Sequence, residues 1–293
     1  MPSDTRDEIT PLTPGTAGRL YLDLLQGCLT RSLFPEAEIP LERSPFLRMQ
    51  PAARLLCAGA DSILGLVGLK LAQRFRAEQR RNGSDWPVAA ETMIGLKRLR
   101  NLEYCLTEVL RNGVPGDLIE TGVWRGGACI YMRAVLKAFG DTTRNVWVCD
   151  SFEGLPKPDT RYKQDEGDTH WKLADVLAVS LEEVQANFSR YELLDDQVRF
   201  LKGWFKDTLP TAQTGPLALL RLDGDMYSST MDALENLYPR LSSGGYVIID
   251  DYGVIPACKD AVEDYRSRHA ISAPIHPVDQ ASVFWQNPPE LQA

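Results

Sequence analysis

Four aspartates stand in two short clusters, Asp223 with Asp225 and Asp250 with Asp251. Each cluster directly follows a short apolar run of the chain. If the two clusters meet in space, their carboxylates would repel one another strongly unless a cation neutralises them. Carboxylate oxygens are the ligands that a hard divalent cation such as Mg²⁺ prefers in proteins. The two clusters therefore indicate a magnesium site.

The elements around the clusters predict that they do meet. The apolar runs over residues 217–222 and 246–249 have the length of buried strands, and residues 228–241 between them have the length and spacing of one helix. Such a unit makes the two strands parallel and usually adjacent. Both clusters would then lie at the carboxyl edge of one sheet, where open α/β folds bind ligands. A solvated turn at the strand end is the alternative for Asp250 and Asp251.

The composition is that of an ordinary globular protein, with 44% hydrophobic and 25% charged residues among 293. The formal net charge of −8 argues against nucleic acid as the main partner. No apolar run approaches the roughly 18 residues that indicate a membrane span. The six cysteines form no CxxC pair and the start of the chain has no signal-peptide pattern, so we expect a cytoplasmic protein with free thiols. Three scattered histidines do not favour a histidine-based metal site.

The chain is expected to consist of three parts. Residues 1–18 are polar and rich in Pro, Thr and Gly, which predicts a mobile tail. Residues 19–112 show stretches of helical periodicity, which predicts an N-terminal helical segment that could act as a lid. From residue 113 to residue 293 strands and helices alternate, which predicts a doubly wound α/β domain with a mostly parallel sheet.

The spacing of apolar residues predicts the elements of each part. In the N-terminal segment we expect a proline-rich loop over residues 34–52 and helices over residues 19–31, 53–80 and 91–112. In the α/β domain we expect strands over residues 117–121, 145–149, 197–201, 217–222 and 246–249. We expect helices there over residues 128–139, 181–191, 228–241 and 257–270, and an antiparallel edge hairpin over residues 275–278 and 283–286.

The loop after the first strand combines a carboxylate with glycines, in the pattern E-x-G-x-x-x-G-G from Glu120 to Gly127. This spacing is not the G-x-G-x-x-G fingerprint that brings a backbone close to a pyrophosphate. A loop that carries a carboxylate suits a cationic ligand instead, and Glu120 could hold the ammonium group of S-adenosylmethionine directly or through water. The second strand ends at Asp150, which could accept both ribose hydroxyls. The alternative is that the glycines only tighten a strand–helix joint.

Two further segments are expected to border the same edge. The third strand runs into Gly203, Trp204 and Phe205, which places an aromatic ring beside the adenine, unless these aromatics are core residues. The long polar connection over residues 153–175 is typical of a lid. Its Tyr162 and Trp171 could stack on a substrate or could equally pack the lid shut.

Together these stretches resemble the macrocin O-methyltransferase family, which methylates sugar hydroxyls on macrolides and other natural products. The mycinamicin and novobiocin sugar methyltransferases are relatives. The resemblance extends over about residues 19–285 and is carried by Asp85-Trp86-Pro87, Thr92-Met93-Ile94-Gly95 and residues 120–129, 149–156, 203–210, 221–227 and 244–253. It implies a class I S-adenosylmethionine methyltransferase fold with the N-terminal helical extension.

The resemblance also implies roles for individual residues. Asp223, Asp250 and Asp251 match the Mg²⁺ ligands of the family, and Asp225 matches its proposed general base. Catechol O-methyltransferases carry a lysine where this chain has Met226, so that base is not available here. The positions that match the cofactor pocket are Thr92, Met93, Glu120, Thr121, Gly122, Trp124, Gly126, Gly127, Ala128, Asp150, Ser151, Gly203, Trp204, Phe205 and Asp223. As an alternative, Asp225 could cap the following helix or bond amides in its turn.

The implied activity is Mg²⁺-dependent methyl transfer from S-adenosylmethionine to a hydroxyl of a deoxysugar on a glycosylated secondary metabolite, as in antibiotic biosynthesis. A phenol, a catechol or another non-sugar hydroxyl is the alternative acceptor. A metal-dependent hydrolase, in which the aspartates activate water, is another alternative, but it would not explain the pair Glu120 and Asp150. A binding protein without catalytic activity is a third. The family also implies a homo-oligomer.

Overall fold

The computed structural model describes residues 16–35, 38–40 and 51–288. Its central sheet has seven strands in the order β5-β4-β3-β6-β7-β9-β8. The parallel strands are β3 (Asp117–Thr121), β4 (Val146–Asp150), β5 (Val198–Lys202), β6 (Leu217–Leu222) and β7 (Leu241–Ile249). An antiparallel hairpin of β8 (His276–Pro277) and β9 (Val283–Gln286) closes one edge. The predicted doubly wound sheet is confirmed, and its strand order reverses between β3 and β6.

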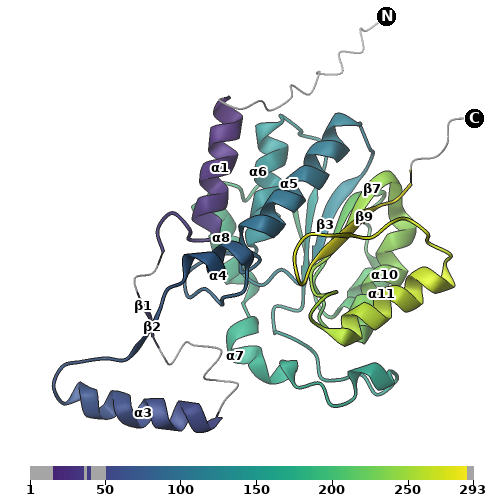
Figure 1. The fold of residues 1–293 in the computed structure, drawn as a ribbon. Coiled ribbons are helices and arrows are strands. Elements are labelled where there is room, and N and C mark those ends of the chain that lie inside the picture. Colours follow the sequence, from purple (N-terminus) through teal and green to yellow (C-terminus); the bar gives the residue numbers. More distant parts are fainter. Residues whose placement is uncertain (1–15, 36–37, 41–50, 289–293) are drawn as a thin grey trace, which may run out of the picture.

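Helices cover both faces of the sheet (Figure 1). On one face α5 (Gly95–Arg111), α6 (Gly127–Ala138) and α8 (Leu181–Arg190) contribute to one core cluster. On the other face α10 (Tyr227–Leu237) and α11 (Pro256–Arg268) contribute to a second. Successive residues of β7 alternate between the two clusters, since Ile248 belongs to the first and Ile249 to the second. Burial on both faces explains why these strands read as continuous apolar runs.

Of the helices that precede the central sheet, α1 (Ala17–Leu29), α4 (Ala77–Asn82) and α5 pack into the body of the molecule. α1 packs against α6 and α5, and α4 packs against α5. Leu22, Leu25 and Leu29 of α1 are buried in the same core cluster as α5. The predicted tail lies almost wholly outside the described residues, and most of the predicted loop over residues 34–52 does so too.

The prediction of one helix over residues 53–80 is wrong. α3 (Pro51–Gly65) ends at a glycine, and Gly68 then adopts a left-handed φ of +74°, a conformation that stops helices. The chain continues into β2 (Ala72–Arg74), which pairs antiparallel with β1 (Glu38–Pro40) before α4 begins. This pairing is not local in sequence, so helical periodicity could not reveal it. α3 stands away from the body on the β1–β2 ladder (Figure 1).

Other bounds differ from the predictions by a few residues. β4 and β5 each begin one residue later than expected, α5 begins at Gly95 instead of residue 91, and β7 begins five residues earlier, at Leu241. α10 ends at Leu237 because a 3₁₀ turn that contains Pro239 follows. The remaining elements are η2 (Lys163–Asp165), η3 (His170–Leu173), α7 (Ala174–Leu177), α9 (Phe205–Thr208), η4 (Leu209–Thr211) and η5 (Tyr238–Arg240). Within the described ranges, no helix is both long and apolar enough to cross a membrane.

Candidate active site

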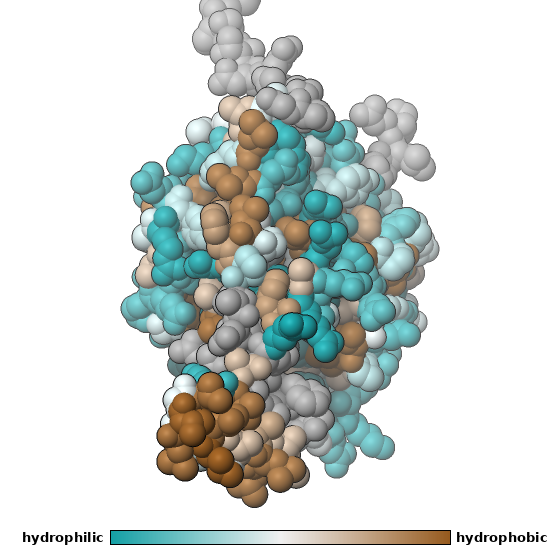
Figure 2. All heavy atoms as spheres, turned by 60° about the vertical axis from the view of Figure 1, so that its left-hand side comes forward, coloured by the Kyte–Doolittle hydropathy of each residue, from teal (hydrophilic) through white to brown (hydrophobic). Residues whose placement is uncertain are grey.

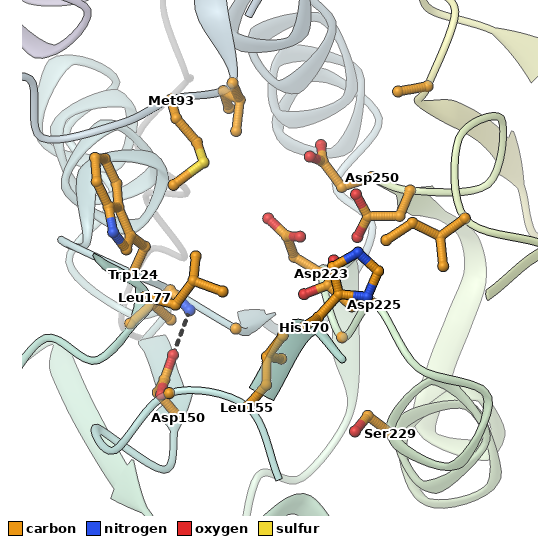
Figure 3. Close-up of a pocket in the computed structure, with 18 of the residues that line it drawn as sticks. Met93, Trp124, Asp150, Leu155, His170, Leu177, Asp223, Asp225, Ser229 and Asp250 are labelled. Carbon is orange, nitrogen blue, oxygen red and sulfur yellow. Dashed lines mark hydrogen bonds between the residues drawn. The ribbon is translucent and has the colours of Figure 1, made fainter. Parts of the chain in front are cut away.

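A cavity of about 1010 Å³ opens at the carboxyl ends of the central strands (Figure 3). Glu120 from β3, Asp150 from β4, Asp223 after β6 and Asp250 after β7 all line it. The two aspartate clusters therefore meet at the edge where the sequence predicted them. Residues predicted to bind S-adenosylmethionine line the same cavity as the two aspartate clusters. The predicted cofactor pocket and the predicted metal site therefore share one space.

The loop after β3 is bent so that only part of it faces the cavity. Gly122 has a φ of +83°, and a Cβ there would lie 1.8 Å from the Asp223 carbonyl oxygen, so only glycine lets the two loops approach. The residues of the predicted pocket that line the cavity are Thr92, Met93, Glu120, Gly122, Trp124, Ala128, Asp150, Ser151, Trp204, Phe205 and Asp223. The other residues predicted for the cofactor pocket do not line the cavity; they are Thr121, Gly126, Gly127 and Gly203.

Glu120 is buried, and each of its carboxylate oxygens already bonds a protein group. Its carboxylate accepts from the Arg221 guanidinium, and the Cys129 thiol lies 2.7 Å from its Oε2. Burial raises the pKa of Glu120 to about 7, although Arg221 opposes this shift. Glu120 therefore faces the cavity as a member of an internal ion pair. That Glu120 holds the ammonium group of S-adenosylmethionine, directly or through water, stays a prediction.

Asp150 is held in a fixed orientation at the end of β4. One carboxylate oxygen accepts the N–H of Val123 and the other that of Phe152, both at 2.8 Å. Burial raises the pKa of Asp150, and these backbone donors counteract the rise. The Ser151 hydroxyl also lies 3.4 Å from the oxygen that binds Phe152. Asp150 lines the cavity, and the oxygen that binds Val123 can still accept from a ligand hydroxyl.

The acidic cluster is compact. Oxygens of Asp223, Asp250 and Asp251 all lie within 4.8 Å of one another. Oδ2 of Asp251 is buried and has no hydrogen-bond partner, an orphaned acceptor that a cation would satisfy. With protein groups alone, burial and the neighbouring carboxylates raise the pKa of Asp251 well above its usual range. The donor set is entirely oxygen, which fits Mg²⁺.

Two arginines that also line the cavity bind this cluster, and sequence reasoning assigned neither to it. Arg221 donates to Asp223 at 2.9 Å and to Asp250 at 2.6 Å. Arg98 of α5 donates to the other oxygen of Asp250 at 2.6 Å and to Asp279 at 2.8 Å. Arg221 could have been noticed in the sequence, because it is the lone charge in an apolar strand. Arg98 could not, since it lies 152 residues from Asp250 in the chain.

Asp225 lies beside this cluster and lines the cavity (Figure 3). Its backbone is left-handed, with a φ of +57°, and burial followed by the charge of Asp223 raises its pKa to about 7. It is not a helix cap, because the first amides of α10 bond Asp165 instead. Met226 is fully buried, so that position does not present its side chain to the cavity.

The connection over residues 153–177 runs along the cavity and contributes Leu155, His170 and Leu177 to its lining (Figure 3). We call it the strap. Tyr162 and Trp171 are not in the lining. Tyr162 packs on Tyr227, with ring centroids 5.0 Å apart, and Trp171 has the ammonium groups of two lysines 5.6 Å from its ring. Tyr162 therefore packs the strap against α10, and Trp171 packs within the strap.

Known proteins match this chain over most of its length. The family model described as Macrocin-O-methyltransferase (TylF) matches residues 18–287. The chain is 48% identical to mycinamicin III 3''-O-methyltransferase of Micromonospora griseorubida, over 94% of this chain and 99% of that protein. It is 63% identical to the 8-demethyl-8-(2,3-dimethoxy-alpha-L-rhamnosyl)-tetracenomycin-C 4'-O-methyltransferase of Streptomyces olivaceus, over 72% of this chain and 81% of that protein. The structure of the O-methyltransferase NovP superposes with a TM-score of 0.80 at 46% identity, over 92% of this chain and 99% of that one.

Proposed function

The chain belongs to the macrocin O-methyltransferase family, and from that membership we propose that it moves a methyl group from S-adenosylmethionine to a sugar hydroxyl of a glycosylated natural product, with Mg²⁺. The observation that carries the proposal is the meeting of three aspartates within 4.8 Å in the same cavity as Asp150 and Asp225. Two relatives support the acceptor class, because their names specify mycinamicin III and a rhamnosyl tetracenomycin C.

The cavity suits a methyl donor beside an acceptor. Its volume of about 1010 Å³ is at the upper end of single-ligand sites, which fits two molecules lying side by side. Asp150 keeps acceptor capacity for ribose hydroxyls, and Trp204 and Phe205 supply apolar surface for a planar base. S-adenosylmethionine, when bound, would bring a methyl group that is already activated towards nucleophiles.

The side chains on the acceptor side divide into two roles. Asp223, Asp250 and Asp251 would hold Mg²⁺, which when bound would make the sugar hydroxyl more acidic. Asp225 accepts the proton of that hydroxyl as the hydroxyl oxygen bonds the methyl carbon. The methyl–sulfur bond of the donor breaks at the same time, and S-adenosylhomocysteine leaves. Arg98 and Arg221 fix the carboxylates of Asp223 and Asp250 so that little reorganisation accompanies the reaction. The protein thus contributes mainly alignment and proton removal.

An acceptor comparison tests the proposed substrate class. Purified enzyme is incubated with S-adenosylmethionine, Mg²⁺ and matched pairs of acceptors, each a rhamnosylated polyketide with its own aglycone, and with simple catechols as the alternative. We expect methylated product, detected by mass, only from the glycosylated member of each pair. Methylation of catechols or of bare aglycones at equal rates would contradict the sugar assignment and favour a phenolic acceptor.

We further propose that the protein is a cytoplasmic homo-oligomer. All six cysteines are free, which suits a reducing compartment, and the net charge of −8 does not suit nucleic acid.

The support for self-association is an apolar surface over and just after α3 (Figure 2). Its side chains are between 59% and 86% exposed and belong to Leu55, Leu56, Ile63, Leu66, Val67 and Leu69. A helix that is apolar around its circumference is normally buried. α3 has only Arg54 and Asp61 as charges, so it lacks the basic face of a membrane-binding helix.

Light scattering after size-exclusion chromatography checks this prediction. We expect the wild type to have the mass of a dimer or a larger assembly. The double variant Leu55→Asp/Leu66→Asp should have the mass of a monomer. Ser62→Asp adds a charge at a polar position of the same helix and should leave the assembly intact. A wild type that is monomeric at micromolar concentration would contradict self-association, and binding to neutral lipid vesicles would assign the apolar surface to a membrane instead.

A further inference from the structure

The strap contains a buried carboxylate that the proposed mechanism does not use. Asp165, the last residue of η2, is 1% exposed. Its two carboxylate oxygens accept the backbone N–H groups of Tyr227 at 2.8 Å and Ser228 at 3.1 Å. These amides are the first two of α10, whose own N-cap residue, Met226, supplies no side-chain acceptor. A residue 62 positions earlier in the chain therefore caps this helix, where the amides and the helix dipole favour a negative charge.

The capped end of α10 directly follows the turn that presents Asp225. In that turn Asp225 is left-handed, and the Met226 N–H donates to the Gly224 carbonyl at 2.6 Å. A non-glycine residue in this conformation is held there by its surroundings. The next two amides along the chain are those that Asp165 binds, so Asp165 fixes the far end of the turn.

The same residue connects the strap to the cavity. The Asp165 carbonyl accepts the Asp168 N–H at 3.1 Å, and the Asp168 carboxylate accepts the backbone N–H of His170 at 2.6 Å. The His170 ring nitrogen Nδ1 lies 3.0 Å from the other Asp168 oxygen. His170 lines the cavity beside Asp225 (Figure 3). Asp165 thus lies where the strap, the helix start and the Asp225 turn join.

We propose that Asp165 is a positioning residue for methyl transfer. It holds the turn that aims Asp225 at the acceptor hydroxyl, and it fastens the strap to that turn. The proposal rests on the proposed role of Asp225 as proton acceptor. The hydrogen bonds of Asp165 go to Tyr227 and Ser228, next to the Asp225 turn, and to Asp168 in the strap. We therefore expect it to act on the acceptor side of the cavity and to leave donor binding unchanged.

The test compares Asp165→Ala, which removes both acceptors, with Asp165→Asn, which keeps the shape and one accepting oxygen. Glu166→Ala, at the exposed next residue, is the matched control. We expect kcat to fall by about 10- to 100-fold in D165A, the loss that misplaced reacting groups typically cause. The KM for S-adenosylmethionine should stay within about twofold, and D165N should lie between D165A and the wild type. Amide hydrogens of Tyr227 and Ser228 should exchange about tenfold faster in D165A than in the wild type.

A folded D165A with the wild-type kcat would overturn the proposal. So would a loss of kcat with an equal loss of affinity for S-adenosylmethionine, because that pattern indicates general loosening of the fold. If D165A does not fold, the same criteria apply to D165N: a kcat equal to that of the wild type, or a loss of kcat with an equal loss of affinity for S-adenosylmethionine, would overturn the proposal. The exchange readout needs no acceptor substrate, so it separates failure of the cap from failure of the proposed role of Asp225.

Discussion

Asp225→Asn is expected to lower kcat by at least about 100-fold, which is the lower range of what general-base catalysis contributes. An amide of the same shape cannot take up the proton of the acceptor hydroxyl. Binding of S-adenosylmethionine should be nearly unchanged, since Asp150 lies across the cavity from Asp225 (Figure 3). Steady-state kinetics with a saturating acceptor, together with calorimetry for the donor, measure the two effects separately.

Asp260→Asn makes the same chemical change on the exposed face of α11 and serves as the control. It should retain wild-type kcat and donor affinity. If Asp225→Asn kept kcat within a few-fold of the wild type, Asp225 would not be the base, although the methyltransferase assignment would stand. His170, which lies beside Asp225 in the cavity, would then be the next residue to substitute.

The second large effect is expected from Asp251→Asn. Oδ2 of Asp251 bonds no protein group, so the substitution leaves no donor unpaired and relieves repulsion within the acidic cluster. The metal-free variant should therefore melt at or above the Tm of the metal-free wild type. Mg²⁺ should raise the Tm of the wild type by mass action but should not raise that of the variant. Its kcat/KM should fall at least about 100-fold, because the cation no longer assists the acceptor.

Asp250→Asn provides the contrast. Both of its oxygens accept from buried or half-buried guanidinium groups of Arg98 and Arg221. Breaking such a pair leaves uncompensated charge and typically costs about 3–5 kcal/mol. We therefore expect this variant to lose both stability and metal response. A Mg²⁺ response in Asp251→Asn equal to that of the wild type, by melting and by calorimetry, would contradict the metal site.

Much of the site could be predicted because its residues follow strand ends. Short apolar runs identify β3, β4, β6 and β7, and parallel strands bring their carboxyl ends to one edge. Glu120, Asp150, Asp223 and Asp250 were placed together on that basis and do line one cavity. The predicted fold of the class I methyltransferase type is confirmed, since the chain superposes on the O-methyltransferase NovP.

What the sequence did not reveal depends on contacts between distant segments. Arg98 reaches Asp250 from α5, and Asp165 caps α10 from the strap, yet neither residue stands out from the polar pattern of its own segment. The helix predicted over residues 53–80 failed for a related reason. Local apolar periodicity continues through Gly65, whereas the pairing of β1 with β2 is decided by a segment some thirty residues earlier.

The arginines also change how the acidic cluster is understood. Repulsion among four aspartates first suggested that a cation must neutralise them. Arg221 and Arg98 already neutralise part of that charge, and each binds carboxylates from more than one segment. Their effect is to orient Asp223 and Asp250, whereas the unpartnered oxygen of Asp251 is the feature that most directly calls for a cation.

The central claim is that the donor's methyl group passes to a sugar hydroxyl with the help of Mg²⁺. The most direct measurement supplies S-adenosylmethionine carrying a trideuteriomethyl group, a rhamnosylated acceptor, and either Mg²⁺ or a chelator. Tandem mass spectrometry then locates the label on the sugar or on the aglycone. We predict label on the sugar fragment alone, lost with chelator and restored by added Mg²⁺. Label on the aglycone, or transfer to the sugar at full rate in the presence of chelator, would contradict the account.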